Sequence, residues 1–346
     1  ILITILTIAL NKTIAQTSYI YPLIPFDFKK FMSDNAMWFV LIILAVALTA
    51  VRPKFMTVGN LTTLISSESV KGIITCGVCW CILSAGLDLG PGAVAALSAV
   101  VSASLAQQAD LPTRLISVHM PAVVCIIVAM VIGAIVGIIC GWLVACTHIH
   151  PFIATLGSQL ICRALAKMYS NKPVSNLDQS FRNFAVYKVG GIPMVVFIFL
   201  IVFIISWFMM TQCRFGKNIF AIGGNRQAAR VAGINVEKNL ILTYMWCGLV
   251  SGLAGAMLAA RTGSADPSTN GLQYEFDAIA AATIGGTSQT GGICRMSGVL
   301  SGILILGIIN NGLVLLGVND NLTQVIKGLI IVVSVVVDMR KNAVRP

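Results

Sequence analysis

Long apolar segments alternate with short polar connections over nearly the whole chain. An α-helix needs about 20 mostly apolar residues to cross the roughly 30 Å hydrocarbon core of a bilayer. The pattern therefore predicts an all-α, polytopic transmembrane helical bundle of about ten spans, including short or re-entrant helices. The predicted spans cover residues 36–51, 70–85, 93–106, 122–145, 152–168, 193–210, 240–260, 274–284, 296–316 and 322–337.

The same pattern divides the chain into three regions. Residues 1–35 are expected to form a peripheral N-terminal segment, because the apolar run at their start has only about 10 residues and is too short to span. Residues 36–340 form the predicted transmembrane domain, and residues 341–346 form a cytoplasmic tail. Basic residues before the first span and after the last one favour the cytoplasm for both ends of this domain.

Residues 214–236 interrupt the apolar pattern and contain no apolar run near 20 residues, so they are expected at the membrane surface. Lys and Arg are enriched in cytoplasmic loops, which places this stretch on the cytoplasmic side. The sequence predicts a short amphipathic helix over residues 227–232, entered through residues 223–225 and left through Gly233. We interpret the stretch as the place where a soluble partner acts on the membrane protein.

Two glycine-rich breaks, residues 86–92 and 285–292, each follow one apolar segment and open another. They indicate either an internal repeat or repeated turn chemistry. Asp88 in the first break either caps the helix that begins after Pro91 or binds an ion or proton. We expect structural turns at four residues of these breaks, Asp88, Gly92, Gly285 and Gly286.

Composition supports a membrane protein and excludes several other classes. Hydrophobic residues make up 57% of the chain and charged residues 10%, against about 25% charged residues in soluble domains. The net charge of +11 comes from loops between apolar segments, where basic residues set topology and meet lipid headgroups, so nucleic acid is not an expected partner. The ten cysteines lie almost all in apolar runs, and no metal site is expected, since Cys76, Cys79 and Cys81 lack a nearby fourth ligand.

Motifs of catalysis are also missing from the sequence. The one Gly-Lys pair, Gly216-Lys217, is followed by Asn218 rather than Ser or Thr, so a phosphate-binding loop for ATP is not formed. We therefore expect neither an enzymatic activity nor a cofactor in this chain. Polar or aromatic residues in or beside spans are candidates for lining a translocation pathway, namely Phe152, Thr155, Asn310 and Asn311.

Small residues recur along two of the predicted spans and favour close contact between helices in a membrane. Gly133, Gly137 and Gly141 follow a Gly-x-x-x-Gly spacing. A second cluster consists of Gly248, Gly252 and Gly255.

Five stretches in order resemble the membrane permease of bacterial ABC sugar importers, in the branch that serves ribose, galactose and methyl-galactosides, xylose, arabinose and autoinducer-2. They are AGLDLGPG (85–92), PFIATLG (151–157), RFGKNIFAIGGNRQAARVAGINV (214–236), YEFDAIAAATIGGTSQTGG (274–292) and INNGLVLLGV (309–318), the last leading to IKGLIIVVSVVVD. The chain departs from the family at Gly90 and Pro91, where the family usually has Ser and a small apolar residue. If that Ser has a direct role in the family, the role is lost here, and a structural turn is the simpler interpretation.

The resemblance implies a transport subunit that works with separate partners. These are a cytoplasmic ABC ATPase, a periplasmic or lipid-anchored sugar-binding protein, and a second permease copy, either identical or a sister chain. It also implies a multi-pass protein in the bacterial cytoplasmic (inner) membrane, surrounded by membrane lipid. The positions that match the family's coupling helix are Gly223, Gly224, Asn225, Ala228, Ala229 and Gly233.

Apart from the resemblance, the residue types of this stretch also suggest a contact with a partner protein. Arg226 and Arg230, at i and i+4, share one face of the predicted helix and are suited to meet partner carboxylates. Small side chains at Ala228 and Ala229 would let the helix seat closely in a groove.

The sequence points to two sugars, because one part of the chain resembles galactose and methyl-galactoside permeases and another resembles ribose permeases. The alternative function is an ion-coupled secondary transporter that uses Asp88 for its ion. Uptake that needs an ATPase partner would separate the first function from the second.

Overall fold

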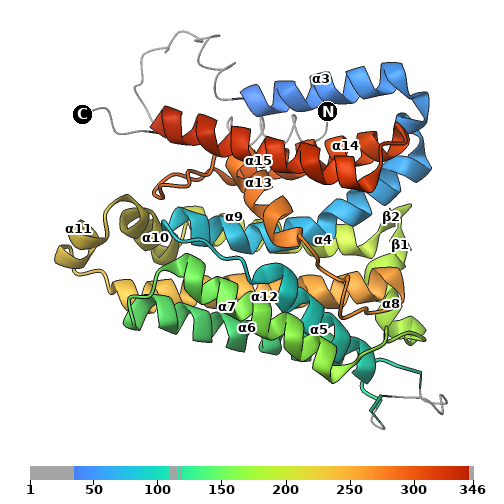
Figure 1. Cartoon of the computed structure of the whole chain (residues 1–346), viewed down its shortest axis with the longest axis horizontal. Helices are drawn as coiled ribbons and strands as arrows, with labels where there is room; N and C mark the ends of the chain where they lie inside the picture. Colours follow the sequence, from blue (N-terminus) through green and yellow to red (C-terminus); the bar gives the residue numbers. More distant parts are fainter. Residues whose placement is uncertain (1–34, 109–114, 117–118, 343–346) are drawn as a thin grey trace, which may run out of the picture.

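The computed structural model describes residues 35–108, 115–116 and 119–342, and its helices run side by side along the long axis of the molecule (Figure 1). The predicted N-terminal segment lies outside these residues, apart from Asn35, and so does the end of the predicted tail. The first half of the described chain contains α3 (Ala36–Val51), the 3-10 helix η1 (Pro53–Met56), α4 (Val58–Leu83), α5 (Pro91–Leu105), α6 (Ala122–Cys146), α7 (Pro151–Tyr169) and α8 (Gln179–Val186).

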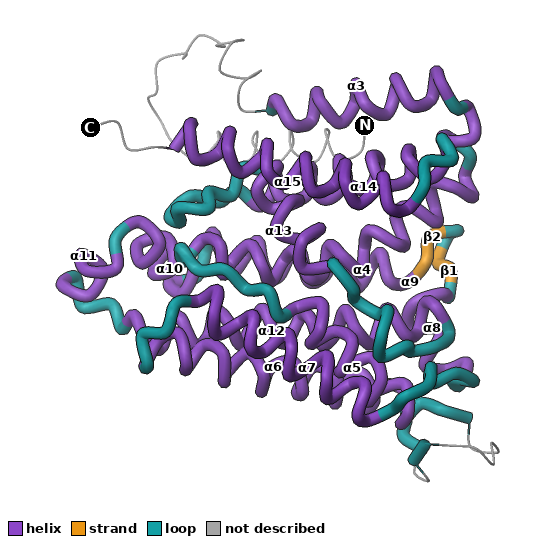
Figure 2. Tube along the Cα trace, viewed as in Figure 1, coloured by secondary structure: helices purple, strands orange, loops and turns teal. Residues whose placement is uncertain are grey.

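Two short strands, β1 (Lys188–Val189) and β2 (Ile192–Pro193), pair antiparallel and lead into the second half (Figure 2). The second half contains α9 (Met194–Thr211), α10 (Arg214–Gly224), α11 (Arg226–Val231), α12 (Val236–Thr262), α13 (Tyr274–Ile284), α14 (Met296–Leu315) and α15 (Asp320–Asn342). The prediction of an all-α bundle is confirmed for the described residues.

Six of the described helices are long and apolar enough to cross a membrane: α4, α6, α9, α12, α14 and residues 321–340 of α15. The shorter apolar helices α3 and α5 fall below this length. With 11 residues, α13 spans roughly 17 Å at about 1.5 Å per residue, which is too short to cross the hydrocarbon core as a helix. The count of about ten spans therefore stays a prediction, and the prediction that one segment is short is confirmed.

Three predicted boundaries differ from the structure. The span expected over residues 70–85 begins at Val58, because the polar first half of α4 is helical as well. Its Thr62 and Ser69 hydroxyls donate to the carbonyl oxygens four residues earlier, which satisfies them inside the helix. The expected loop 170–188 contains α8, and the stretch 214–224, for which no helix was predicted, forms α10. Both short helices bury apolar side chains on one side, such as Phe181 of α8 and Ile219 of α10.

The centre of the fold is α12, which packs against α6, α5 and α4. The glycines on these helices allow the close packing that their spacing predicts. A Cβ added to Gly133 would overlap the carbonyl oxygen of Gly248, and one added to Gly252 would overlap the carbonyl oxygen of Ala129. The backbones therefore approach each other directly, in a way that only small residues permit.

This packing predicts a large difference between two Gly→Ala substitutions. Gly248→Ala places a Cβ against the Gly133 carbonyl, and we expect a loss of about 1–3 kcal/mol of folding stability from overpacking. In Gly157→Ala, the matched control on α7, the new Cβ meets nothing within 4 Å. Thermal unfolding of both variants in detergent measures the difference, and equal melting temperatures would contradict the proposed helix contact.

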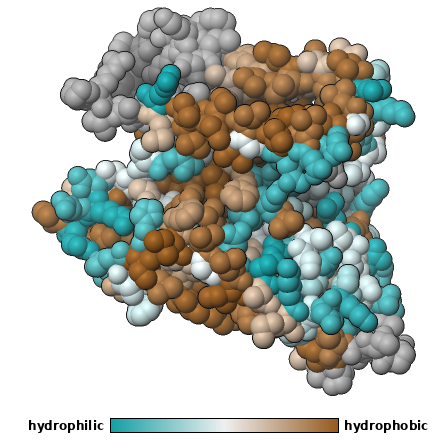
Figure 3. Space-filling model, viewed as in Figure 1, coloured by the Kyte–Doolittle hydropathy of each residue, from teal (hydrophilic) through white to brown (hydrophobic). Residues whose placement is uncertain are grey.

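Apolar side chains also cover much of the outside of the bundle. On α15 the exposed apolar residues include Leu322, Val325, Leu329, Val332 and Val333, and on α9 they include Ile201, Ile204 and Phe208. Figure 3 shows apolar side chains gathered over α15 in the upper part of the view and polar ones at the end where α10 and α11 lie. This distribution suits a bundle surrounded by lipid, with α10 and α11 at its polar edge.

Candidate functional site

At one end of the bundle, α10 and α11 connect α9 to α12 (left in Figure 1). Local hydrogen bonds define α11 at both ends. The Asn225 side chain accepts the backbone N–H groups of Gln227 and Ala228, both at 3.0 Å, as an N-cap residue does. After α11, Gly233 has φ +83°, and the Ile234 N–H returns to the Ala229 carbonyl at 3.0 Å. The helix predicted over residues 227–232 is confirmed, shifted by one residue to 226–231.

The exposed side of α11 carries Arg226, Gln227, Ala228 and Arg230, and Val231 at its end is 90% exposed. Ala229 is only 3% exposed and belongs to the apolar core of the chain itself. Of the two neighbouring alanines, Ala228 therefore has its methyl group on the exposed side, while Ala229 anchors the helix.

Both arginines of α11 have acceptors within the chain. Arg230 forms an ion pair with Glu237 in the first turn of α12. Arg226 Nη2 donates to the Ser84 carbonyl oxygen just after α4, at 3.4 Å. A cavity of about 160 Å³ lies beside them and is lined also by His148 and Gln227. The arginines thus link α11 to the bundle, in addition to any contact they make with partner carboxylates.

At the end of α10, the second glycine-rich break meets the end of α4, directly before the first break. The Gly292 N–H of the second break donates to the Leu83 carbonyl oxygen before the first break, at 2.9 Å. A Cβ on Gly223 would overlap that same oxygen and would lie 2.5 Å from the Gly292 nitrogen. A Cβ on Gly291 would lie 2.7 Å from both Ala85 Cβ and the Gly223 carbonyl oxygen. We call these residues, Leu83, Ala85, Gly223, Gly291 and Gly292, the glycine junction.

A buried network of charged side chains lies among α4, α13 and α15. Lys71 Nζ is 3.0 Å from Glu68 Oε1 and 3.1 Å from Asp277 Oδ2. Lys327 Nζ is 3.2 Å from Asp277 Oδ1. Lys71 also lies 5.7 Å from the centre of the Tyr274 ring, within range of a cation–π contact.

A polar contact on the other side of α13 joins it to α7. Gln159 Nε2 donates to Glu275 Oε1 at 2.9 Å. Arg163 Nη1 donates to the carbonyl oxygens of Pro267 and Asn270 in the loop before α13, at 3.2 and 2.7 Å. Arg163 thus has partners inside the protein, as expected for a basic residue in a predicted span. Charged residues on several elements therefore converge on the short helix α13.

Comparison with known proteins assigns the chain to a family. The family model described as branched-chain amino acid transport system / permease component matches residues 60–335, which includes the glycine junction, α11 and the charged network. The chain belongs to this permease family.

The curated relatives of this permease include three sugar transport proteins. It is 38% identical over 320 residues to the ribose import permease protein RbsC of Escherichia coli, covering 91% of this chain and 96% of the relative. It is 36% identical over 322 residues to the galactose/methyl galactoside import permease protein MglC of Haemophilus influenzae, covering 90% and 96%. It is 38% identical over 316 residues to the D-allose transport system permease protein AlsC of Escherichia coli, covering 91% and 94%. No solved structure matches the chain significantly.

In this permease Asp88 forms a turn and does not cap α5. Its Oδ1 accepts the Gly90 N–H at 2.9 Å, and the N-cap residue of α5, Gly90, has no side-chain capping bond. The capping interpretation is therefore wrong in detail, because the carboxylate reaches the residue before the helix rather than the helix itself. Burial raises the pKa of the Asp88 carboxyl, which lies between α4 and α5, to about 6, and the Gly90 N–H opposes this shift.

The other predicted turn residues lie at close backbone contacts or in a left-handed turn. A Cβ on Gly92 would overlap the Glu275 carboxylate and the Gly271 carbonyl oxygen. A Cβ on Gly285 would overlap the Gly298 carbonyl oxygen, while Gly286 has φ +86°. The sequence signal for these turns came from glycine density alone, and the structure adds the tertiary contacts.

The predicted pathway residues do not form one site. Phe152 and Thr155 lie on α7, in the lower half of Figure 1, while Asn310 and Asn311 lie on α14, in the upper half. Thr155 is fully buried, and its hydroxyl donates to the Pro151 and Leu87 carbonyl oxygens. Asn311 exchanges two side-chain hydrogen bonds of 2.9 Å with Asn60 of α4. These hydrogen bonds give Thr155 and Asn311 a structural role.

Sequence reasoning missed Glu68, Lys71, Asp277 and Lys327 as a group. The sequence did carry a sign of this network. Glu68 and Lys71 are three residues apart, and Lys327 is a charged residue within an apolar run. Ionisable residues within membrane helices mark functional positions by default. The partners could not be assigned because they lie on α4, α13 and α15, far apart in the sequence.

Proposed function

We propose that the chain is the permease subunit of an ATP-driven ABC importer for a monosaccharide, with ribose and galactose or methyl-galactoside as first candidates. The similarity over 91% of the chain to the ribose import permease of Escherichia coli carries this proposal. The similar match to a galactose/methyl galactoside permease keeps the second sugar open. The family match over residues 60–335 supports a transport role rather than an enzymatic one.

The proposal includes partners and a location. A cytoplasmic ABC ATPase supplies the ATP hydrolysis, a periplasmic or lipid-anchored binding protein delivers the sugar, and a second permease copy completes the pathway. The chain crosses the bacterial inner membrane several times, in contact with lipid. The apolar outer surfaces of α9 and α15 and the polar edge at α11 support this arrangement.

In this proposal the ATPase docks at the exposed side of α11, around Ala228 and Val231. A movement of α11 reaches the bundle along two routes. One is the Arg226 contact with the Ser84 carbonyl oxygen, and the other is the packing of Gly223 in the glycine junction. Because the junction joins the second glycine-rich break to the segment that leads into the first, a single displacement acts on α4–α5 and α13–α14 together.

The test is sugar-stimulated ATP hydrolysis in liposomes that contain the chain, its ATPase and its binding protein. We expect stimulation by ribose or by galactose and methyl-galactoside. Ala228→Trp adds bulk on the exposed side of α11 and is expected to lower the stimulated rate at least about tenfold, the effect of losing roughly 1.4 kcal/mol of interaction. Ile204→Trp, at a position 57% exposed on α9, is the control and should keep the rate.

Two outcomes would count against this function. Full stimulation in Ala228→Trp would remove α11 from the coupling contact. Uptake by the chain alone, driven by an ion gradient and lost in Asp88→Asn, would favour the ion-coupled secondary transporter.

A further inference from the structure

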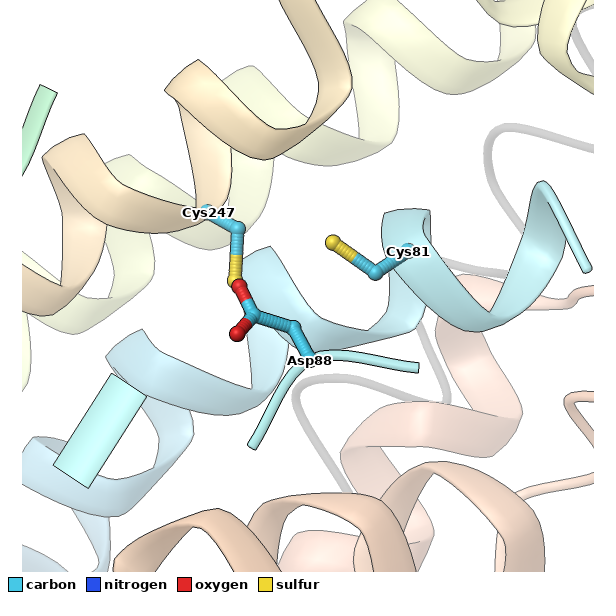
Figure 4. A group of neighbouring side chains, drawn as sticks. All are labelled: Cys81, Asp88 and Cys247. Carbon is cyan, nitrogen blue, oxygen red and sulfur yellow. The ribbon is translucent and has the colours of Figure 1, made fainter. Parts of the chain in front are cut away.

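Three possible metal ligands, Cys81, Asp88 and Cys247, lie close together (Figure 4). Cys81 belongs to the last turns of α4, Asp88 to the first break, and Cys247 to α12. The two thiol sulfurs and a carboxylate oxygen all lie within 4.8 Å of one another. All three residues are buried, with Cys81 and Cys247 at 0% exposure and Asp88 at 6%. Figure 4 shows the Cys247 sulfur directed at the carboxylate and the Cys81 sulfur facing the same space.

A fourth polar group lies next to these three. Tyr244 is on the same face of α12, three residues before Cys247, and is fully buried. Its hydroxyl has no hydrogen-bond partner among the described residues. A Cβ added to Gly86, in the same break as Asp88, would lie only 2.6 Å from this hydroxyl. A buried hydroxyl without a partner costs about 1–3 kcal/mol, which a ligand in this space would relieve.

We propose that Cys81, Cys247 and Asp88 bind a Zn²⁺ ion, with the Tyr244 hydroxyl or a solvent molecule in the fourth position. Two thiolates and one carboxylate form a donor set typical of tetrahedral Zn²⁺, because soft sulfur ligands select this ion over Mg²⁺ or Ca²⁺. Zn–S bonds of about 2.3 Å place two tetrahedral sulfurs roughly 3.8 Å apart. The side chains thus need to move inward by about 1 Å or less from their present separation.

Binding changes the protonation of the site. Each thiol gives up its proton to solvent as its sulfur becomes a zinc ligand, so two protons leave for each ion that enters. The bound ion adds two positive charges to one carboxylate and two thiolates, which leaves a site with one net negative charge. Zn²⁺ affinity should therefore fall as the pH falls, since protons compete for the same sulfurs.

The sequence predicted no metal site, and the proposed ligands are not the three cysteines that lie close together in it. Cys76, Cys79 and Cys81 are close in sequence, but Cys79 faces Met296 of α14, with its sulfur 3.9 Å from the Met296 sulfur. Cys81 faces α12 instead, because an α-helix turns by about 100° for each residue. The missing ligands come from elements that the sequence does not place beside α4.

The test measures metal binding by the full-length chain, purified in detergent without a histidine tag. Competition with a chromophoric chelator gives the stoichiometry and affinity for Zn²⁺. Substitution with Co²⁺ adds a spectroscopic signature, because thiolate-to-cobalt charge transfer and tetrahedral ligand-field bands report the sulfur ligands directly. We expect one ion per chain with both signatures. This binding test involves neither ATPase nor sugar, so its result is independent of the proposed transport function.

Three variants and one control locate the ion. Losing a residue that only orients a metal ligand typically weakens metal affinity about 10–100-fold. Losing a ligand itself should cost more, so Cys81→Ser, Cys247→Ser and Asp88→Asn should each weaken Zn²⁺ affinity by at least that much. Cys125→Ser removes an equally buried thiol on α6 and should leave affinity and spectrum unchanged.

Two results would overturn the site. One is a wild-type chain that takes up no Zn²⁺ or Co²⁺ at micromolar concentrations, in which case the three groups are only hydrogen-bonded to one another. The other is bound Co²⁺ whose charge-transfer band survives in both cysteine variants. The wild-type measurement decides the matter even if a variant fails to fold.

Discussion

Lys71→Met is expected to lower the folding stability of the chain by about 3–5 kcal/mol, the typical loss when one partner of a buried ion pair is removed. Lys71 contacts both Glu68 and Asp277 and is 13% exposed in its side chain. The substitution leaves the Glu68 carboxylate, 6% exposed, without its nearest cation. Methionine preserves most of the volume, so the change reports charge rather than a cavity. Thermal or denaturant unfolding in detergent gives the measurement.

Three further variants separate the electrostatic cause from a general loss of packing. Lys172→Met, at an exposed position in the loop before α8, should change stability by less than about 0.5 kcal/mol. Lys327→Met should have a smaller effect than Lys71→Met, because Lys327 is more exposed and Lys71 still pairs with Asp277. The double variant Glu68→Gln with Lys71→Met should recover part of the loss. A double variant no more stable than Lys71→Met would contradict the charge explanation.

Gly223→Ala is expected to abolish most sugar-stimulated ATP hydrolysis in the reconstituted system. The new Cβ would overlap the Leu83 carbonyl oxygen and press on the Gly292 nitrogen, both of them backbone atoms. Overpacking of this kind costs about 1–3 kcal/mol, and here it separates the three segments that meet in the glycine junction. If only the contact between α10 and the breaks is lost, the chain stays folded while ATP hydrolysis no longer responds to sugar.

Gly59→Ala is the matched control, because a Cβ at this position of α4 meets nothing within 4 Å. Both variants should be compared for melting temperature as well as for stimulated ATP hydrolysis. A folded Gly223→Ala variant with full stimulation would show that the junction does not transmit movement of α11. Loss of stimulation in Gly59→Ala would show that the assay responds to any added methyl group.

Where chemistry is local, the sequence predicted structure well. The short helix α11 lies within one residue of its predicted position. The Asn225 side chain accepts the N–H groups two and three residues later, and Gly233 supplies the left-handed turn. The apolar runs predicted most helices for the same reason, since a helix closes its own hydrogen bonds and needs only a suitable exterior. The short length of α13 could also be predicted from the sequence, since only 11 residues separate two polar stretches.

The sequence left more than one partner open for several residues. The sequence placed Arg226 and Arg230 on one face and offered them to a partner protein. The structure gives Arg230 to Glu237 and directs Arg226 to the Ser84 carbonyl oxygen. The sequence offered Asp88 either as a cap of α5 or as an ion or proton site, and its oxygen accepts the Gly90 N–H rather than capping the helix. Each alternative was chemically reasonable, and only the path of the backbone selected among them.

The sequence by itself determined a helical membrane protein of the permease family, with a polar stretch that caps its own short helix, because hydropathy and capping act within one segment. The tertiary structure alone decided that Gly223 packs between the end of α4 and the second glycine-rich break, that Lys71 meets Asp277, and that Cys81 faces Cys247. These pairs lie on different helices. Their meeting depends on how backbones approach at small residues and on which side of each helix turns inward, and neither is fixed by the spacing of residues along the chain.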